Sequence, residues 1–232
     1  MNNCKIKPCY PHPLQSRAFT LAEVLITLVI VGIVAALTIP SAINNTKKHE
    51  YVAGVKKAYS VLSQSAYKIG QRKGYAVGDF SFLQGIDFMD EFSKEVNVAK
   101  KCDTTEECFG SEFVGANVKY IYLKPNAGKP SYYADKAIIT SDGIMYSLAQ
   151  RGSGITAFGL APEDTENIVG RFVVDVNGQK GPNQIGVDTF FFFILSTKGI
   201  VPAGANSASD CHKSGNGLTC AARVLKENAM NY

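Results

Sequence analysis

The feature that most constrains this chain is an apolar stretch near its start. Residues 19–39 contain a single charged side chain, Glu23, and no proline, and Pro40 follows directly. As an α-helix rising 1.5 Å per residue, such a stretch reaches about 30 Å, the thickness of the hydrocarbon core of a bilayer. A carboxylate in an apolar segment of this kind is costly and is normally kept because it has a partner. The stretch therefore predicts a membrane-length helix in which Glu23 needs a cation that the helix itself does not contain.

The residues at the start of this stretch carry a resemblance to a known family. Ala18 is followed by Phe19-Thr20-Leu21-Ala22-Glu23-Val24-Leu25-Ile26. This run resembles the processing and methylation site of type IV prepilins and type II secretion pseudopilins. The resemblance implies that a prepilin peptidase cuts between Ala18 and Phe19 and that the new amine of Phe19 is methylated. It also implies that Glu23 pairs with the terminal amine of a neighbouring subunit in a filament. The family usually has glycine before the cut, where this chain has Ala18.

Two other interpretations explain part of the same segment. An ordinary secretory signal has a basic start, an apolar core and a cleavage site of small residues. Lys5, Lys7 and Arg17 would supply the start, Val24–Leu37 the core, and Pro40-Ser41-Ala42 the cut. A plain membrane anchor explains the length alone. Neither accounts for Glu23, because a charge at that edge helps neither insertion nor cleavage.

The distribution of charge along the chain indicates on which side of the membrane each part lies. The chain has 232 residues and a formal charge of +4, and three of these excess charges lie in residues 1–18, which contain no acid. Without these residues the charge is close to neutral, which removes any argument for nucleic-acid binding from net charge. A basic segment before a membrane helix stays on the cytoplasmic side. The residues after the helix are therefore expected outside the cytoplasm.

The cysteines fit an oxidising compartment. Cys4 and Cys9 lie in the leader, and the other four form two close pairs, Cys102 with Cys108 and Cys211 with Cys220. In such a compartment two local disulfides are the simplest arrangement, although four cysteines allow three pairings. A zinc site is the alternative, but neither pair has the CxxC spacing that is typical of one.

The helical pattern continues beyond Pro40 but becomes amphipathic. Apolar side chains recur every three or four residues from Tyr51 to Ile69, with lysines between them, and Gly70 and Gly74 mark the end. One helix of about 50 residues, apolar in its first half and amphipathic in its second, matches the architecture of pilins. The expected organisation is a leader at 1–18, a transmembrane or filament-core half-helix at 19–40, an amphipathic half-helix at 41–74, and a globular head outside the cytoplasm at 75–232.

The head is expected to be an α+β, pilin-like domain in which the long helix packs on a mostly antiparallel sheet. Residues 75–117 are predicted to be loop-rich, with a short helix around Asp87–Asn97. The tail from Leu218 to Tyr232 is predicted to form a short helix or an irregular strand. One face of the apolar run Phe190–Phe193 is expected to meet the helix. The predicted strands are Val118–Leu123, Ala137–Thr140, Ile144–Leu148, Ile168–Val176, Thr189–Leu195 and Ile200–Pro202, with a hairpin turn at Ser141-Asp142-Gly143.

The stretch from Asp175 to Phe190 resembles the C-terminal part of many bacterial pilin-like and pseudopilin heads. Its Asp175, Asn177, Asn183 and Asp188 place four side-chain oxygens on one short loop. Calcium takes six to eight oxygen ligands, so the loop is a candidate calcium site. The alternative is a turn rich in Asp and Asn whose side chains bind its own backbone amides.

No catalytic constellation emerges from the sequence. The histidines, His12, His49 and His212, lack the spacing of a metal site or of a nucleophile and its base. Ser65-Ala66-Tyr67-Lys68 matches SxxK, but it is best explained as polar positions of the amphipathic helix. Tyrosines together with Lys119, Lys124, Lys129 and Lys136 could form a weakly basic aromatic patch that touches DNA. Lysines scattered over the surface are the more usual explanation of such a pattern.

Taken together, the residues and the resemblance predict a structural subunit of a type II secretion pseudopilus or a type IV pilus, not an enzyme. The implied partners are copies of the chain or other pilins, prepilin peptidase, an inner-membrane assembly platform and membrane lipid. Glu23 and Pro40 are the residues assigned to assembly, and Phe19 carries the methylated amine. The alternative is an anchored or secreted binding domain that never polymerises. A periplasmic hydrolase would require a base and a nucleophile that the sequence does not offer.

Overall fold

The computed structural model describes residues 19–109, 120–124, 136–150 and 158–232. The chain divides into two compact units, with the boundary between Asn44 and Asn45. The helix α1 (Leu21–Arg72) contributes to both units, and Pro40 lies inside it. Every strand among the described residues lies in the second unit.

In the second unit, α1 packs on a sheet through one stripe. Its buried residues recur at helical spacing from Tyr51 to Gly70, as expected for an amphipathic helix. Gly54 lies where this stripe meets the end of a strand, because a Cβ added there would come within 2.7 Å of Cβ of Val176. The close approach explains a glycine in a helix interior, where it otherwise costs stability.

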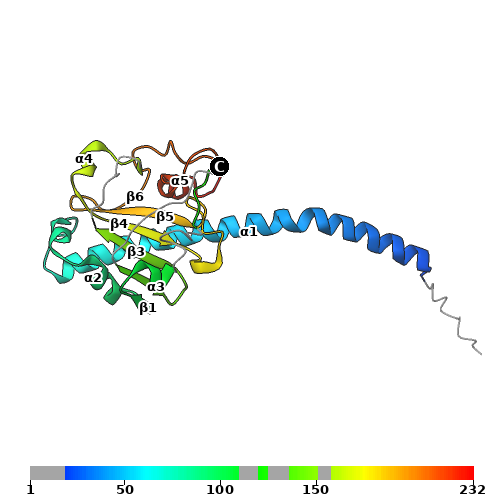
Figure 1. Cartoon of the computed structure of the whole chain (residues 1–232), viewed down its shortest axis with the longest axis horizontal. Helices are drawn as coiled ribbons and strands as arrows, with labels where there is room; N and C mark the ends of the chain where they lie inside the picture. The colour runs from blue at the N-terminus through cyan, green and yellow to red at the C-terminus, as the bar shows by residue number, and fades with distance from the viewer. Residues whose placement is uncertain (1–18, 110–119, 125–135, 151–157) are drawn as a thin grey trace, which may run out of the picture. The chain divides into compact units, whose positions relative to one another are not determined.

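In the described part of the chain the sheet has six strands, each antiparallel to its neighbours and arranged in chain order from β1 to β6. Figure 1 shows this sheet beside α1. Such an order needs only chain-sequential connections between neighbouring strands. The hairpin turn between β2 and β3 contains Gly143 at φ 86°, a conformation that favours glycine. The strands are β1 (Val98–Cys102), β2 (Lys136–Thr140), β3 (Met145–Gln150), β4 (Ile168–Asp175), β5 (Thr189–Leu195) and β6 (Gly199–Pro202).

Both faces of the sheet are covered, so β5 is buried along its whole length. Phe190 and Phe192 belong to the core on the α1 side, whereas Phe191 and Phe193 belong to the core on the opposite side. This alternation follows from the two-residue period of a strand. It confirms that one face of the Phe190–Phe193 run meets the long helix.

The shorter helices cover these two faces. α2 (Phe88–Glu95) and α5 (Cys220–Glu227) contribute to the core that contains α1. α3 (Thr105–Phe109) contributes to the opposite core through Cys108 and Phe109. The other elements that the described residues form are a 3-10 turn, η1 (Ser81–Gly85), a single-turn helix, α4 (Pro162–Thr165), and a further 3-10 turn, η3 (Gly178–Lys180).

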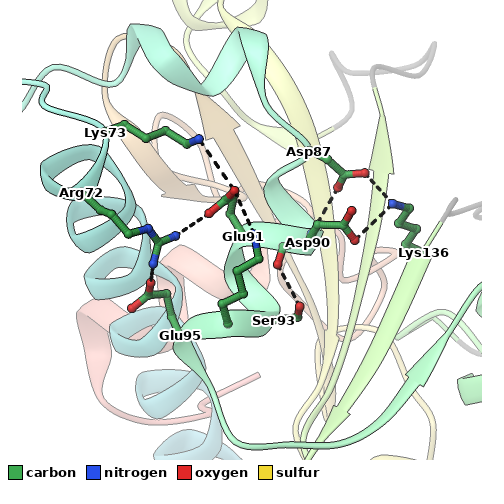
Figure 2. Close-up of polar contacts among 9 residues, drawn as sticks. Arg72, Lys73, Asp87, Asp90, Glu91, Ser93, Glu95 and Lys136 are labelled. Atoms are coloured by element: carbon green, nitrogen blue, oxygen red, sulfur yellow. Dashed lines mark hydrogen bonds and ion pairs between the residues drawn. The ribbon is translucent and has the colours of Figure 1, made fainter.

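Ion pairs hold α2 between α1 and the sheet (Figure 2). In the last turn of α1, Arg72 binds both Glu91 and Glu95 of α2. From β2, the Nζ of Lys136 lies 2.5 Å from Asp87 and 3.2 Å from Asp90 at the other end of α2. Asp87 also caps the helix by accepting a hydrogen bond from the backbone N–H of Asp90.

Most of the expected elements are confirmed, and two expectations are corrected. The strands expected from Ala137 onward and the short helix within Asp87–Asn97 are all present, and the tail is helical in α5. The interval 75–117 was predicted to be loop-rich with one short helix, but it also contains β1, an exposed edge strand whose apolar pattern is weak. The strand expected at Val118–Leu123 is wrong in its described part: Ile121 makes only an isolated parallel bridge to Gln184. Residues 118 and 119 lie outside the described residues.

Candidate functional site: the start of the long helix

The long helix begins with a reciprocal cap between Thr20 and Glu23. The Oε2 atom of Glu23 accepts hydrogen bonds from the backbone N–H of Thr20 at 2.8 Å and from its hydroxyl at 2.9 Å. The Thr20 hydroxyl oxygen in turn accepts one from the backbone N–H of Glu23 at 3.2 Å. This is the capping box, in which a Thr and a Glu three residues apart satisfy backbone donors that the first turn leaves free.

The cap leaves part of the Glu23 carboxylate available. Within the described residues, its Oε1 atom makes no hydrogen bond or ion pair. Phe19, which precedes Thr20, has 85% of its surface exposed. A cation near the Oε1 atom would therefore not compete with the cap.

After the cap, α1 presents apolar side chains in every direction. Its large hydrophobic residues from Leu21 to Ile43 are exposed, Leu37 by 76%. The first part of α1 is long and apolar enough to cross a membrane, by length and composition. Its threonines bond to the helix itself, Thr27 to the carbonyl of Val24 and Thr38 to that of Val34. The hydroxyls of these two threonines are thus satisfied within the helix, as an apolar environment requires.

Comparison with protein families assigns this segment. Residues 14–39 match the family model described as the prokaryotic N-terminal methylation motif. The chain carries the type IV pilin and pseudopilin signature. No curated protein and no solved structure matches the chain.

The pilin signature has consequences for processing, location and class. It implies cleavage by prepilin peptidase and assembly into pilin filaments. Together with the apolar helix, it fits an anchor in the inner membrane. The proteins that carry it are structural rather than catalytic. Ala18, the residue assigned to the cleavage site with Phe19, lies outside the described residues.

Most side-chain oxygens of the 175–188 loop already accept hydrogen bonds, but the Oδ1 atom of Asn177 is buried without a partner within the described residues. Asp188 accepts hydrogen bonds from the backbone N–H groups of Asn183 at 2.8 Å and Gln184 at 2.6 Å. Asp175 accepts one from the Tyr120 hydroxyl at 2.7 Å and one from the backbone N–H of Asn177 at 3.2 Å. All four carboxylate oxygens thus face donors, which favours a self-satisfied turn. The calcium site stays a prediction.

Both carboxyl groups of this loop are fully buried. Burial raises the pKa of Asp175 well above its usual value, and the charge of nearby Asp188 adds to this effect. Burial also raises the pKa of Asp188, although hydrogen bonds from Gln184 and Asn183 oppose it. Desolvation disfavours the charged form of a carboxyl group, and two like charges in one site reinforce that preference.

The four cysteines of the head form two disulfides, Cys102–Cys108 and Cys211–Cys220. Each pair closes a short loop, with Cα atoms 5.7 Å and 4.8 Å apart. The first bond joins the end of β1 to α3, and the second joins a loop to the start of α5. No group of three or more His, Cys, Asp or Glu residues arranged to hold a metal occurs in the described part of the chain.

The lysines of the weakly basic aromatic patch do not all face solvent as free charges. Lys136 is engaged by two aspartates of α2. Lys119 and Lys129 lie outside the described residues. Lys136 thus has a structural role in its ion pairs with α2, and its position adds nothing in favour of nucleic-acid binding.

Sequence reasoning missed two features of these sites. The capping box was present as Thr20-x-x-Glu23, which is a recognisable helix-start signal. The hydrogen bond from Tyr120 to Asp175 joins residues 55 positions apart and has no local signal. Only the fold brings its two ends together.

Proposed function

We propose that this chain is a filament subunit of a type II secretion pseudopilus or a type IV pilus. The observation that carries the proposal is the coincidence of the methylation motif at residues 14–39 with a capped helix whose apolar side chains are exposed. Before assembly, lipid covers these side chains in the cytoplasmic membrane. In the filament, apolar helices of other subunits replace the lipid around the same surface.

The proposed life cycle assigns a step to each residue of the motif. Prepilin peptidase cuts between Ala18 and Phe19, and the amine of Phe19 is methylated. The inner-membrane assembly platform then adds the subunit to copies of itself or to other pilins. Glu23 sets the axial register by pairing with the Phe19 amine of a neighbour, using the carboxylate oxygen that the cap leaves available. Pro40 closes the half-helix that enters the filament core.

The head is proposed to lie outside the cytoplasm. Its two disulfides support this, because disulfides persist in oxidising compartments. The basic residues before the apolar helix support the same orientation, since they favour the cytoplasmic side.

The first test is the intact mass and the N-terminal sequence of the protein from a host that contains a prepilin peptidase. The expected product starts at methylated Phe19. A chain that starts near Ile43, or one that is not cut at all, would overturn the proposal. Either result would instead favour the alternative, an anchored or secreted binding domain that does not polymerise.

The role of Glu23 is tested by two substitutions that separate charge from capping. Glu23→Ala removes both the charge and the cap, whereas Glu23→Gln keeps an oxygen that can cap Thr20. If Glu23 pairs with a neighbour's amine, both variants insert into the membrane normally and both lose about tenfold or more of the filament yield, because each leaves the amine unpaired. Filament yield is measured by shearing and immunoblotting. Wild-type assembly by Glu23→Gln would show that capping alone matters.

A further inference from the structure

A polar groove lies beside the second half of α1, where the helix passes the β2–β3 turn and the residues that follow α2. Its volume is about 330 Å³, within the range of sites that hold small ligands. The groove belongs entirely to the second unit of the chain. Its lining includes the ionisable side chains and hydroxyls of Lys57, Ser65, Lys68, Glu95, Asp142 and Tyr146.

Both acids of the groove already have partners. Asp142 lies 2.5 Å from the Nζ of Lys57 and accepts a hydrogen bond from the Thr140 hydroxyl. Glu95 is bound by Arg72 from the last turn of α1 (Figure 2). Neither carboxylate is therefore available to attract a cation from solution.

Unlike these two acids, the donor groups of Tyr146, Ser65 and Lys68 have no partners within the described residues. Tyr146 is 1% exposed and Ser65 is 4% exposed, and both reach the groove. Within the described part of the chain, neither hydroxyl makes a hydrogen bond, and Lys68 makes no ion pair. Burial and the charge of nearby Asp142 raise the pKa of Tyr146, so its hydroxyl keeps its proton and remains a donor at neutral pH. Both hydroxyls open onto the groove and are not sealed from solvent, so a ligand that displaces water there can accept their hydrogen bonds.

We propose that this groove binds a carboxylate group, with Lys68 supplying the opposite charge and the hydroxyls of Tyr146 and Ser65 donating hydrogen bonds. A carboxylate offers only acceptors, which complements the ammonium group of Lys68 and the two hydroxyl donors. One uncompensated lysine matches a single negative charge. The carboxylate comes from a free small acid or from an Asp or Glu side chain of a second copy. The second source rests on the proposed filament.

The first experiment uses the full chain in detergent and does not depend on assembly. The probe is N-acetyl-glutamate amide, which carries one side-chain carboxylate, and N-acetyl-glutamine amide is its neutral match. Binding is followed by saturation-transfer NMR. We expect the first probe to bind and the second to bind much more weakly. Equal binding of the two, or binding of neither together with a negative second experiment, overturns the proposal.

Substitutions locate the binding. Lys68→Gln is expected to weaken it about tenfold, the usual scale for a charge-assisted hydrogen bond. Tyr146→Phe is expected to weaken it severalfold and to leave the unfolding temperature unchanged, because the lost hydroxyl has no partner within the described residues. Lys56→Gln is the matched control, since Lys56 is an exposed lysine of the same helix that does not line the groove. An effect of Lys56→Gln equal to that of Lys68→Gln would contradict the assignment.

The second experiment identifies where the bound carboxylate comes from. Assembled filaments are treated with a carbodiimide, which joins an amine directly to a carboxylate, and the cross-linked peptides are mapped by mass spectrometry. A bond from Lys68 to an acidic side chain of another copy, absent in Lys68→Gln, identifies the second copy as the source. Probe binding without this bond identifies a free acid. If no filament forms, the proposed function fails while the probe experiment still decides the groove.

Discussion

Asp175 ends β4 with no exposed surface, and its surroundings favour the neutral carboxyl group. Burial is the main cause of the raised pKa, and Asp188 contributes the second. Hydrogen bonds from Tyr120 and from backbone N–H groups act in the opposite direction but do not outweigh them. Asp175 therefore has a structural role in the turn, and its titration makes the stability of the folded protein depend on pH.

The sign of this dependence follows from linkage. The folded state holds the Asp175 proton to a higher pH than the unfolded state does. Its contribution to stability is therefore complete below the unfolded pKa near 4 and is lost as pH rises through the folded pKa. In Asp175→Asn the loss disappears, because the amide does not titrate. Denaturant unfolding at a series of pH values should show the wild type losing stability relative to this variant as pH rises; parallel curves would contradict the prediction.

Asp142 provides a control, because its contribution to stability changes with pH in the opposite direction to that of Asp175. Burial raises the pKa of its carboxyl group, but the ion pair with Lys57 and the hydrogen bond from Thr140 outweigh burial and leave the pKa lowered. The stability that Asp142 contributes is present above its unfolded pKa and is lost as pH falls through the folded one. Asp142→Asn should therefore remove a loss on the acid side, in contrast to Asp175→Asn.

At the scale of elements, α5 depends on a covalent bond for its position. The helix has eight residues, too few to be stable alone in water. The bond from Cys220 at its start to Cys211 holds it in the core with Val224, and all three residues are buried. Tyr232 follows the helix and donates a hydrogen bond to the carbonyl of Gly186.

Replacing Cys211 and Cys220 together by alanine is expected to lower the free energy of unfolding by roughly 2–4 kcal/mol, because the unfolded chain loses a loop constraint. Thermal unfolding under non-reducing conditions measures the change. Replacing Cys102 and Cys108 in the same way serves for comparison, since that bond closes a similar loop at the sheet edge. A double variant at 211 and 220 with unchanged stability would show that packing alone holds α5.

The position of α2 depends instead on a forked ion pair (Figure 2). Arg72 reaches Glu91 and Glu95 at once through two nitrogens of one guanidinium group. A lysine ammonium at the same position is a point charge and does not reproduce this fork. We expect Arg72→Lys to speed amide hydrogen exchange in residues 88–95 while the unfolding temperature changes little. Exchange at the wild-type rate would contradict the role of the fork.

At the scale of the whole molecule, the two units depend on different surroundings. The second unit, Asn45–Tyr232, contains both hydrophobic cores and both disulfides. The helical residues before it expose their apolar side chains and bury almost none. One unit is built to fold in water, and the other is built for lipid or for the interior of an assembly.

A fragment that starts at Asn45 is therefore expected to fold by itself and to stay soluble without detergent, whereas the chain from Phe19 needs detergent. Circular dichroism and a cooperative thermal transition measure folding, and ultracentrifugation measures association. A fragment starting at Tyr51 serves as a control, because it lacks Lys48, whose Nζ donates to the carbonyl of Met230. A fragment from Asn45 that unfolds or aggregates would show that the head needs the preceding helix.

The sequence by itself determined the parts of this protein that depend on local pattern. The membrane-length helix, its amphipathic continuation, the β2–β3 hairpin and the strand β5 all follow from the spacing of apolar residues and from turn residues. The motif around Phe19 and Glu23 was readable for the same reason, since its chemistry lies within a few consecutive positions. β1 was not predictable, because an exposed edge strand with two lysines has almost no apolar signal.

Only the tertiary structure decided what distant residues do together. It placed Tyr120 on Asp175, Lys136 on α2, and a donor-rich groove between α1 and the β2–β3 turn. It also turned both carboxylate oxygens of Asp188 toward backbone donors, which a count of oxygen-bearing side chains does not reveal. The physical reason is that burial and hydrogen-bond partners depend on contacts across the fold, whereas periodicity and motifs are properties of neighbouring positions.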